Sequence, residues 1–204
     1  KFMEKPFSPA CERNQDAILR AILPKLKATR KLLEIGSGTG QHAVYFTKHM
    51  PWLDWQCSDI QENLSGITAW IHEARLNNLP DPIPLDVSVT HVTQKYDTIY
   101  SCNTLHIMST SEVEALFNLA GTIATDDAGL LIYGPFKYGG KYTADSNVNF
   151  DQWLKERDPK SGVRDFEWVN TLANKAGFKF ITDQAMPANN NLLYWRRSSS
   201  SSLI

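Results

Sequence analysis

Hydrophobic residues in this chain gather in short blocks separated by longer stretches of mixed polarity. Short apolar blocks with turn residues on either side predict strands, and they cover residues 31–35, 54–57, 83–85, 96–102, 129–133, 179–183 and 192–197. The mainly apolar run at 96–102 is typical of the centre of a parallel sheet. Pro82 and Pro84 lack the N–H that a sheet ladder needs, so the strand around Ile83 is expected at an edge.

The stretches between these blocks predict helices over residues 16–23, 41–50, 61–77, 111–124 and 164–176. Asp16 is the expected N-cap of the first helix, and Gly177 the expected C-cap of the last. Alternation of strand and helix predicts an α/β fold: a seven-stranded, mostly parallel sheet with helices on both faces. The last two strands are near neighbours in sequence, so we expect a C-terminal antiparallel hairpin.

Residues 135–161 interrupt this alternation, and we expect an irregular lid insertion there with one short helix at 149–156. The rest predicts a single domain over residues 1–197. The serine run at 198–202 predicts a disordered tail, or a remnant of cloning, over residues 198–204.

The first strand runs into a glycine-rich turn, Gly36-Ser37-Gly38-Thr39-Gly40, which a helix follows. Glycine at every second position leaves the backbone free to adopt positive φ and lets a ligand approach closely. Glu34 stands two residues before the first glycine. Its carboxylate would repel a pyrophosphate but suits a ligand with an ammonium group or ribose hydroxyls.

The glycine spacing distinguishes this loop from two other classes of glycine-rich binding loop. A dinucleotide-binding loop needs its third glycine where Gln41 stands, and a phosphate-cradling loop needs lysine after the last glycine. The acidic-x-Gly-x-Gly-x-Gly pattern resembles the first motif of class I S-adenosylmethionine-dependent methyltransferases. The resemblance implies their Rossmann-like fold, with the main chain around Gly36, Ser37, Gly38 and Gly40 against S-adenosylmethionine; a glycine turn in another α/β protein is the alternative.

Further polar residues follow the other predicted strands. Asp59 follows the second strand and could accept both hydroxyls of an adenosine ribose or cap the next helix. Asp86 follows the third and could accept the adenine amino group, with Val87 packing on the ring, or cap a loop. Asn103 follows the fourth, within reach of a bound ligand. Ligands of open α/β sheets bind beyond the carboxyl ends of strands, so we expect these residues and Glu34 to share one cofactor site.

Five motifs together resemble a methyltransferase-like family of unknown function, which is grouped as S-adenosylmethionine-dependent by similarity. They are Lys5-Pro6-Phe7-Ser8-Pro9-Ala10-Cys11-Glu12-Arg13-Asn14, Leu33-Glu34-Ile35-Gly36-Ser37-Gly38-Thr39-Gly40-Gln41-His42, Asn103-Thr104-Leu105-His106-Ile107-Met108, Tyr133-Gly134-Pro135-Phe136 and Met186-Pro187-Ala188-Asn189-Asn190. The resemblance covers residues 5–197. It implies the fold and the cofactor, and it supplies no substrate.

Methyl transfer demands no particular catalytic residue, because the cofactor carries both the reactive carbon and its leaving group. His106 follows the fourth strand and is the candidate general base, or it only fixes its loop. Tyr142 lies among the aromatics of the lid and is a second catalytic candidate, and those aromatics suit a small, partly polar acceptor or simply pack the lid. Arg13 precedes the first predicted helix and could reach the cofactor carboxylate or lie in a solvated turn. The fourth strand lacks the Asn/Asp-Pro-Pro-Tyr/Phe motif, which disfavours methylation of nucleic-acid bases or glutamine amides.

Composition and charge limit the classes of partner that the chain is expected to bind. The chain has 204 residues, 42% of them hydrophobic and 21% charged, with a net charge of −1. No Lys/Arg run attracts nucleic acid, no apolar run reaches the length of a membrane span, and the three cysteines have no metal-ligand spacing, so we expect no metal. With the methyltransferase resemblance and the aromatic lid, these features lead us to expect a cytoplasmic methyltransferase acting on a small molecule. They indicate no oligomeric state. A non-catalytic S-adenosylmethionine-binding or protein-interaction module and a protein methyltransferase remain the alternatives, and a nicotinamide oxidoreductase is the least expected.

Overall fold

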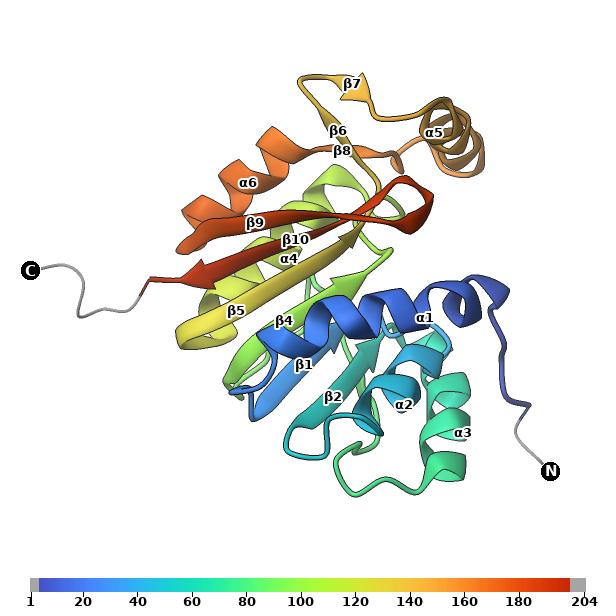
Figure 1. The fold of residues 1–204 in the computed structure, drawn as a ribbon, viewed down its shortest axis with the longest axis vertical. Helices are drawn as coiled ribbons and strands as arrows, with labels where there is room; N and C mark the ends of the chain where they lie inside the picture. The colour runs from blue at the N-terminus through green and yellow to red at the C-terminus, as the bar shows by residue number, and fades with distance from the viewer. Residues whose placement is uncertain (1–3, 199–204) are drawn as a thin grey trace, which may run out of the picture.

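The computed structural model describes residues 4–198 and contains a central sheet of seven strands in the order β3-β2-β1-β4-β5-β10-β9 (Figure 1). The strands are β1 (Lys31–Ile35), β2 (Asp54–Asp59), β3 (Ile83–Pro84), β4 (Tyr96–Cys102), β5 (Ala124–Gly134), β9 (Phe178–Met186) and β10 (Asn190–Arg197). Neighbouring strands among β1 to β5 pair in parallel, and β10 pairs antiparallel with both β5 and β9. The predicted fold class is confirmed, including the C-terminal hairpin and the edge position of β3.

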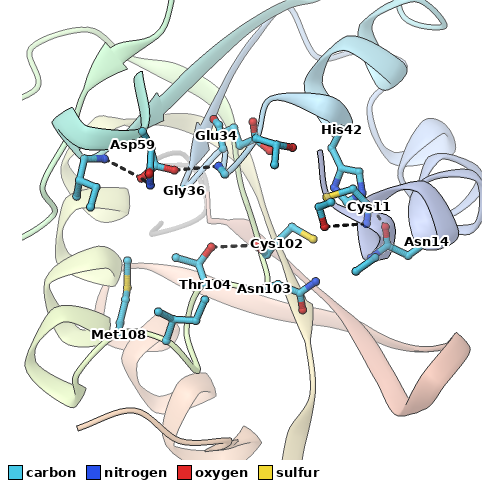
Figure 2. Close-up of a pocket in the computed structure, with 18 of the residues that line it drawn as sticks. Cys11, Asn14, Glu34, Gly36, His42, Asp59, Cys102, Asn103, Thr104 and Met108 are labelled. Carbon is cyan, nitrogen blue, oxygen red and sulfur yellow. Dashed lines mark hydrogen bonds between the residues drawn. The ribbon is translucent and has the colours of Figure 1, made fainter. Parts of the chain in front are cut away.

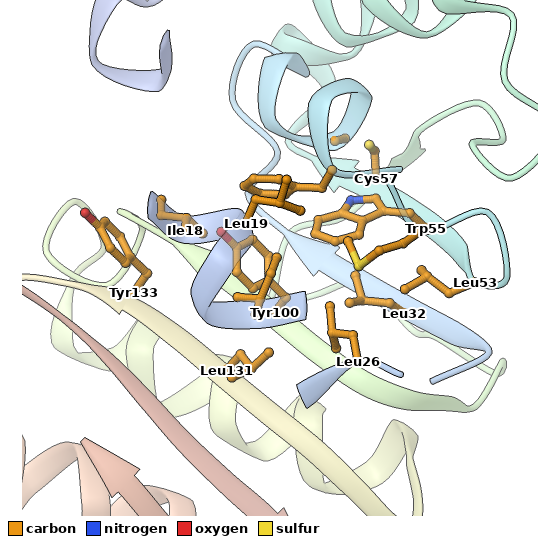
Figure 3. Packing of buried hydrophobic residues seen from close by; sticks show 14 of the residues in the cluster. Ile18, Leu19, Leu26, Leu32, Leu53, Trp55, Cys57, Tyr100, Leu131 and Tyr133 are labelled. Atoms are coloured by element: carbon orange, nitrogen blue, oxygen red, sulfur yellow. The ribbon is translucent and has the colours of Figure 1, made fainter. Parts of the chain in front are cut away.

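Helices cover both faces of the sheet (Figure 1). They are α1 (Pro9–Ile22), α2 (Gln41–Thr47), α3 (Leu64–Ala74), α4 (Thr110–Ile123), α5 (Asp145–Arg157) and α6 (Phe166–Lys175), with short 3-10 turns at Leu23–Lys25, Gln61–Asn63 and Pro187–Asn189. Successive side chains of β1 point to opposite faces of the sheet and so belong to two hydrophobic cores. Leu32 packs with α1, α2 and α3, and Leu33 packs with α4 and α6. Figure 3 shows the first core around Trp55 and Tyr100. Nowhere in residues 4–198 does a helix combine the length and the apolarity that a bilayer span requires.

The first helix begins earlier than the sequence predicted. It starts at Pro9, and the Ser8 hydroxyl accepts a hydrogen bond from the Cys11 N–H at 3.4 Å. Proline at the first helical position needs no N–H partner, so Ser8-Pro9 is a sufficient start. Asp16 therefore lies inside α1 rather than at its N-cap, and Arg13 lies in the helix rather than before it.

The predicted irregular lid is largely ordered into regular elements. Strands β6 (Phe136–Tyr138), β7 (Lys141–Tyr142) and β8 (Arg164–Asp165) form a second, three-stranded sheet in the order β7-β6-β8. Helix α5 has 13 residues and begins four positions before the expected short helix. Together β6, β7 and α5 lie beyond the carboxyl ends of the central strands (Figure 1). Of the predicted serine-rich tail, residues 199–204 lie outside the described part of the chain.

Candidate functional site

A cavity of about 500 Å³ opens at the carboxyl ends of β1, β2 and β4, with α1 along one side. Six of the sequence-predicted residues line it: Glu34, Gly36, Ser37, Gly38, Asp59 and Asn103. In Figure 2, Asp59 and Met108 lie toward one end of this first cavity, and Cys11, Asn14 and His42 lie toward the other. The strand-end positions deduced from the sequence therefore meet in one space.

The glycine turn shapes the cavity floor. Gly36 has φ +78°, and a Cβ built there would lie 2.8 Å from the Thr104 hydroxyl, so this position tolerates no side chain without a shift. Gly38 has φ +61°, and a Cβ there would meet nothing within 4 Å. The Gly36 and Ser37 N–H groups both donate to the Ser58 carbonyl, at 3.1 and 2.9 Å. The Gly38 N–H donates to Asp59, so the N–H groups of Gly36, Ser37 and Gly38 are already engaged within the protein.

Glu34 is a buried acid at the base of the cavity, with 2% of its surface exposed. Burial raises its pKa to about 7, and the nearby Asp59 charge contributes to the rise, while hydrogen bonds from neighbours such as Ser37 and Trp55 oppose it. The Trp55 indole N–H donates to Glu34 Oε1 at 3.1 Å. A cationic ligand group beside this carboxylate would stabilise its ionised form.

Asp59 ends β2 and already accepts three hydrogen bonds. Its Oδ1 accepts from the Ile60 N–H at 2.7 Å and from Asn63 Nδ2 at 2.9 Å, and its Oδ2 accepts from the Gly38 N–H at 2.9 Å. A carboxylate has about four acceptor positions. One lone pair on Oδ2 therefore remains for a ligand hydroxyl, where the sequence reasoning expected two hydroxyls to bind.

Helix α1 supplies a wall that the sequence reasoning missed. Cys11 and Asn14 line the cavity from one face of the helix, and His42 of α2 faces them. The Asn14 Oδ1 atom lies 2.7 Å from His42 Nε2, within hydrogen-bond distance. Burial lowers the pKa of His42 to about 4, so the imidazole is neutral at physiological pH. The Gln41 side chain holds the start of the helix, since Oε1 accepts from the Ser8 N–H at 2.5 Å. The Ser8-Pro9 helix start was the sequence signal for this wall.

The loop after β4 divides its side chains between two cavities. Asn103, with φ +54°, and Thr104, Ile107 and Met108 line the first cavity. His106 points instead into a second cavity of about 280 Å³ below α5. Ile107 lines both.

This loop is braced from outside by the segment that follows α5. Four successive carbonyls, those of residues 105–108, each accept a hydrogen bond from residues 161–164. The Arg164 guanidinium donates to the Leu105 and Met108 carbonyls, the Gly162 N–H donates to the His106 carbonyl at 2.9 Å, and the Ser161 hydroxyl donates to the Ile107 carbonyl at 2.7 Å. The brace fixes the wall that the two cavities share.

The other predicted residues lie outside the first cavity. Gly40 caps α2 with φ +93°, and a Cβ there would come within 3.2 Å of Ile67 and Trp70 of α3, so its role in the fold is close helix packing. The exposed Asp86 carboxylate accepts from the Ser88 N–H at 3.0 Å, as a loop cap does. Val87 packs against the α4 side of the sheet.

Arg13 is exposed on α1 and does not line the cavity, whereas its neighbour Asn14 does. Tyr142 lies on β7, where its hydroxyl donates to Asp151 of α5. This hydrogen bond raises the pKa of Tyr142 to about 12, with burial adding to the effect. Tyr142 lines neither the first nor the second cavity.

A model of the family described as "protein of unknown function (DUF938)" matches residues 5–197. The chain belongs to this family. The match spans both sheets and every residue named above as lining the first cavity.

Solved structures with a similar fold include several methyltransferases. An O-methyltransferase family protein from Burkholderia thailandensis superposes with a TM-score of 0.76 at 16% identity, covering 91% of this chain and 59% of that one. Human N-acetylserotonin methyltransferase in complex with SAM gives 0.77 at 17%, covering 93% and 53%. Mitomycin 7-O-methyltransferase gives 0.81 at 14%, covering 93% and 54%. The chain spans little more than half the length of these proteins, and at such identities the likeness shows the fold.

Proposed function

We propose that this protein is an S-adenosylmethionine-dependent methyltransferase that acts on a small-molecule acceptor. One observation carries the proposal: two carboxylates, Glu34 and Asp59, and the bare turn at Gly38 line a single cavity at the carboxyl ends of neighbouring parallel strands. This is the position where open α/β sheets bind nucleotide-like ligands. The fold shared with methyltransferases supports the same assignment.

The lining residues fit the chemistry of S-adenosylmethionine. Asp59 keeps one acceptor position for a ribose hydroxyl, and Glu34 is a buried carboxylate that an ammonium group can ionise. The space beside Gly38 is open, and a side chain at this position would project into the cavity. Ser37, Asn103 and Asn14 add polar atoms from three different sides of the cavity.

S-adenosylmethionine, when bound, supplies a methyl group on a sulfonium leaving group. The protein then has to hold the acceptor in line and, for a protonated nucleophile, take up a proton. His106 is the candidate general base that would accept this proton. Burial and the Arg164 charge lower its pKa to about 4, so the imidazole is neutral at physiological pH and free to accept.

Isothermal titration with S-adenosylmethionine and S-adenosylhomocysteine tests the proposal. We expect binding to the wild type, and at least tenfold weaker binding in Gly38→Val, whose side chain enters the cavity, and in Asp59→Ala, which loses the carboxylate. Gly139→Val is the matched control, because Gly139 has φ +57° and open space around it but lies in the turn between β6 and β7. No binding to the wild type near millimolar ligand, or equal affinity in all variants, would overturn the assignment.

A non-catalytic S-adenosylmethionine-binding module is the second candidate, because neither His106 nor Tyr142 lines the first cavity. Turnover separates the two functions. Methyl transfer to any member of a broad panel of small-molecule acceptors supports the enzyme, and cofactor binding without transfer across that panel supports the binding module.

A further inference from the structure

The second cavity lies below α5 and shares Ile107 with the first. Its remaining lining comes from the loop after β4, from α5 and from the segment that follows α5: His106, Phe150, Trp153, Leu154, Arg157, Asp158 and Ser161. Its volume of about 280 Å³ suits a ligand of one or two rings. A molecule held here would lie on the other side of the wall that the loop at residues 105–108 forms between the two cavities.

His106 is a polar group of this cavity whose ring nitrogens are available to a ligand. It is 6% exposed, and within residues 4–198 neither of its ring nitrogens makes a hydrogen bond. Its ring meets Phe150 edge-on, with centroids 5.2 Å apart. The ring nitrogens keep some accessible surface, and a neutral imidazole can accept a hydrogen bond through one of them. It therefore favours a ligand that brings a hydroxyl.

Aromatic rings form one wall, and a cation stands at its edge. Phe150 and Trp153 stack at 5.9 Å with an interplanar angle of 18°, and Trp153 keeps 48% of its surface exposed. The Arg157 guanidinium lies 4.5 Å from the Trp153 ring, and in the described chain no carboxylate oxygen lies within 4 Å of it. The half-buried Arg164 adds a second positive charge nearby, and Asp158 is the one acidic residue in the lining. The wall favours a flat ring with an anionic substituent.

We propose that the second cavity is the acceptor subsite and that it binds a hydroxylated aromatic acid. The ring lies against Phe150 and Trp153, the hydroxyl faces His106, and the carboxylate faces Arg157. The role of the bound acid as methyl acceptor rests on the proposed methyltransferase function. Binding of the acid in the second cavity does not depend on that function.

The experiment titrates 3-hydroxy-2-naphthoate, and separately the neutral 2-naphthol, into the full chain with and without saturating S-adenosylhomocysteine. Three variants are compared with the wild type: Trp153→Ala, Arg157→Gln and the distant control Lys175→Gln on α6. We expect the acid to bind the wild type and the control whether or not S-adenosylhomocysteine is present. Its affinity falls at least tenfold in Trp153→Ala. In Arg157→Gln it falls at least fivefold, while 2-naphthol changes by less than twofold.

The proposal is overturned if 3-hydroxy-2-naphthoate does not bind at millimolar concentration, if S-adenosylhomocysteine displaces it, or if neither variant changes its affinity. Arg157 is exposed, so its variant stays informative even if Trp153→Ala fails to fold. S-adenosylhomocysteine affinity is read in the same titrations, and we expect it to be equal in all four proteins. A chain that binds the acid but not S-adenosylhomocysteine overturns the acceptor role and the proposed function, and the reverse result overturns the acid site alone.

Discussion

The two cavities are built from different material. The first is bounded by strand ends, by main chain at residues 36–39 and by three buried or partly buried acids, Glu34, Asp59 and Glu112. The second is bounded by aromatic side chains on α5, a helix that lies outside the central sheet. One wall, the braced loop at residues 105–108, belongs to both.

This difference predicts different responses to substitution. The first cavity depends on backbone conformations that the sheet itself requires, so changes there act on the fold as well as on the ligand. The second depends on side chains that extend from the surface of one helix, so changes there act chiefly on ligand choice.

The largest effect is expected at Gly36. Alanine there combines a positive φ with a Cβ 2.8 Å from Thr104, and we expect a loss of about 4 kcal/mol in the free energy of unfolding. Gly38→Ala, with a similar φ and open space, should lose only about 1 kcal/mol. Urea denaturation of both variants measures the contrast, and equal losses would show that crowding by Thr104 contributes nothing.

Glu34 should make stability fall as pH rises. Its pKa is about 7 in the folded chain against 4.5 ordinarily, so between these values the folded state binds more protons than the unfolded state. Stability is therefore lost through this window, by about 3 kcal/mol. Glu34→Gln keeps an acceptor for the Trp55 N–H and removes the loss, so the variant should match the wild type at pH 4 and exceed it at pH 8. Parallel stability curves for the two proteins would contradict the prediction.

His106, in the second cavity, should give a slope of similar size and opposite sign. Its pKa is about 4 in the folded chain against 6.5 ordinarily, so the folded state binds fewer protons between these values. Stability is lost as pH falls from 6.5 to 4, by about 3 kcal/mol. His106→Gln should remove this loss, while His42 titrates in both proteins and cancels in the difference. A variant that keeps the full acid loss would show that His106 does not contribute to it.

The smallest effect is expected at Tyr142. Phenylalanine there removes the hydrogen bond to Asp151, which joins β7 to α5, and should lower the free energy of unfolding by about 1 kcal/mol. Because Tyr142 lines neither cavity, methyl transfer should stay within twofold of the wild-type rate. A loss of tenfold or more, at unchanged stability, would restore the catalytic role that the sequence suggested.

The sequence was sufficient where local chemistry decides the structure. The block at 31–35 and the run at 96–102 became strands with the predicted bounds, and Glu34 and Asp59 meet because strand ends converge at one edge of a parallel sheet. The helix after β4 begins at Thr110, one residue before the predicted start, with a capping box of Ser109 and Glu112.

The rest depends on tertiary direction, which spacing alone does not give. His106 and Ile107 are adjacent, yet the turn at residues 104–108 directs them into different cavities. Asp86 follows its strand at the expected offset, but its carboxylate caps its own loop and stays exposed. The length of α5 was underestimated because Asp145 and the polar residues after it give it only weak amphipathicity. Its contact with the loop after β4, where Phe150 packs on His106, is tertiary and has no local sequence signal.

The brace between residues 105–108 and 161–164 has a consequence for changes in chain length. The four carbonyls and their donors must keep their register. A residue inserted or deleted between Asp158 and Arg164 would shift the donors and break these hydrogen bonds. The turn at Gly139 and Gly140, where added side chains would meet open space, carries no such constraint. We therefore expect the lid to accept inserted residues in the turn between β6 and β7 but not in the segment that joins α5 to β8.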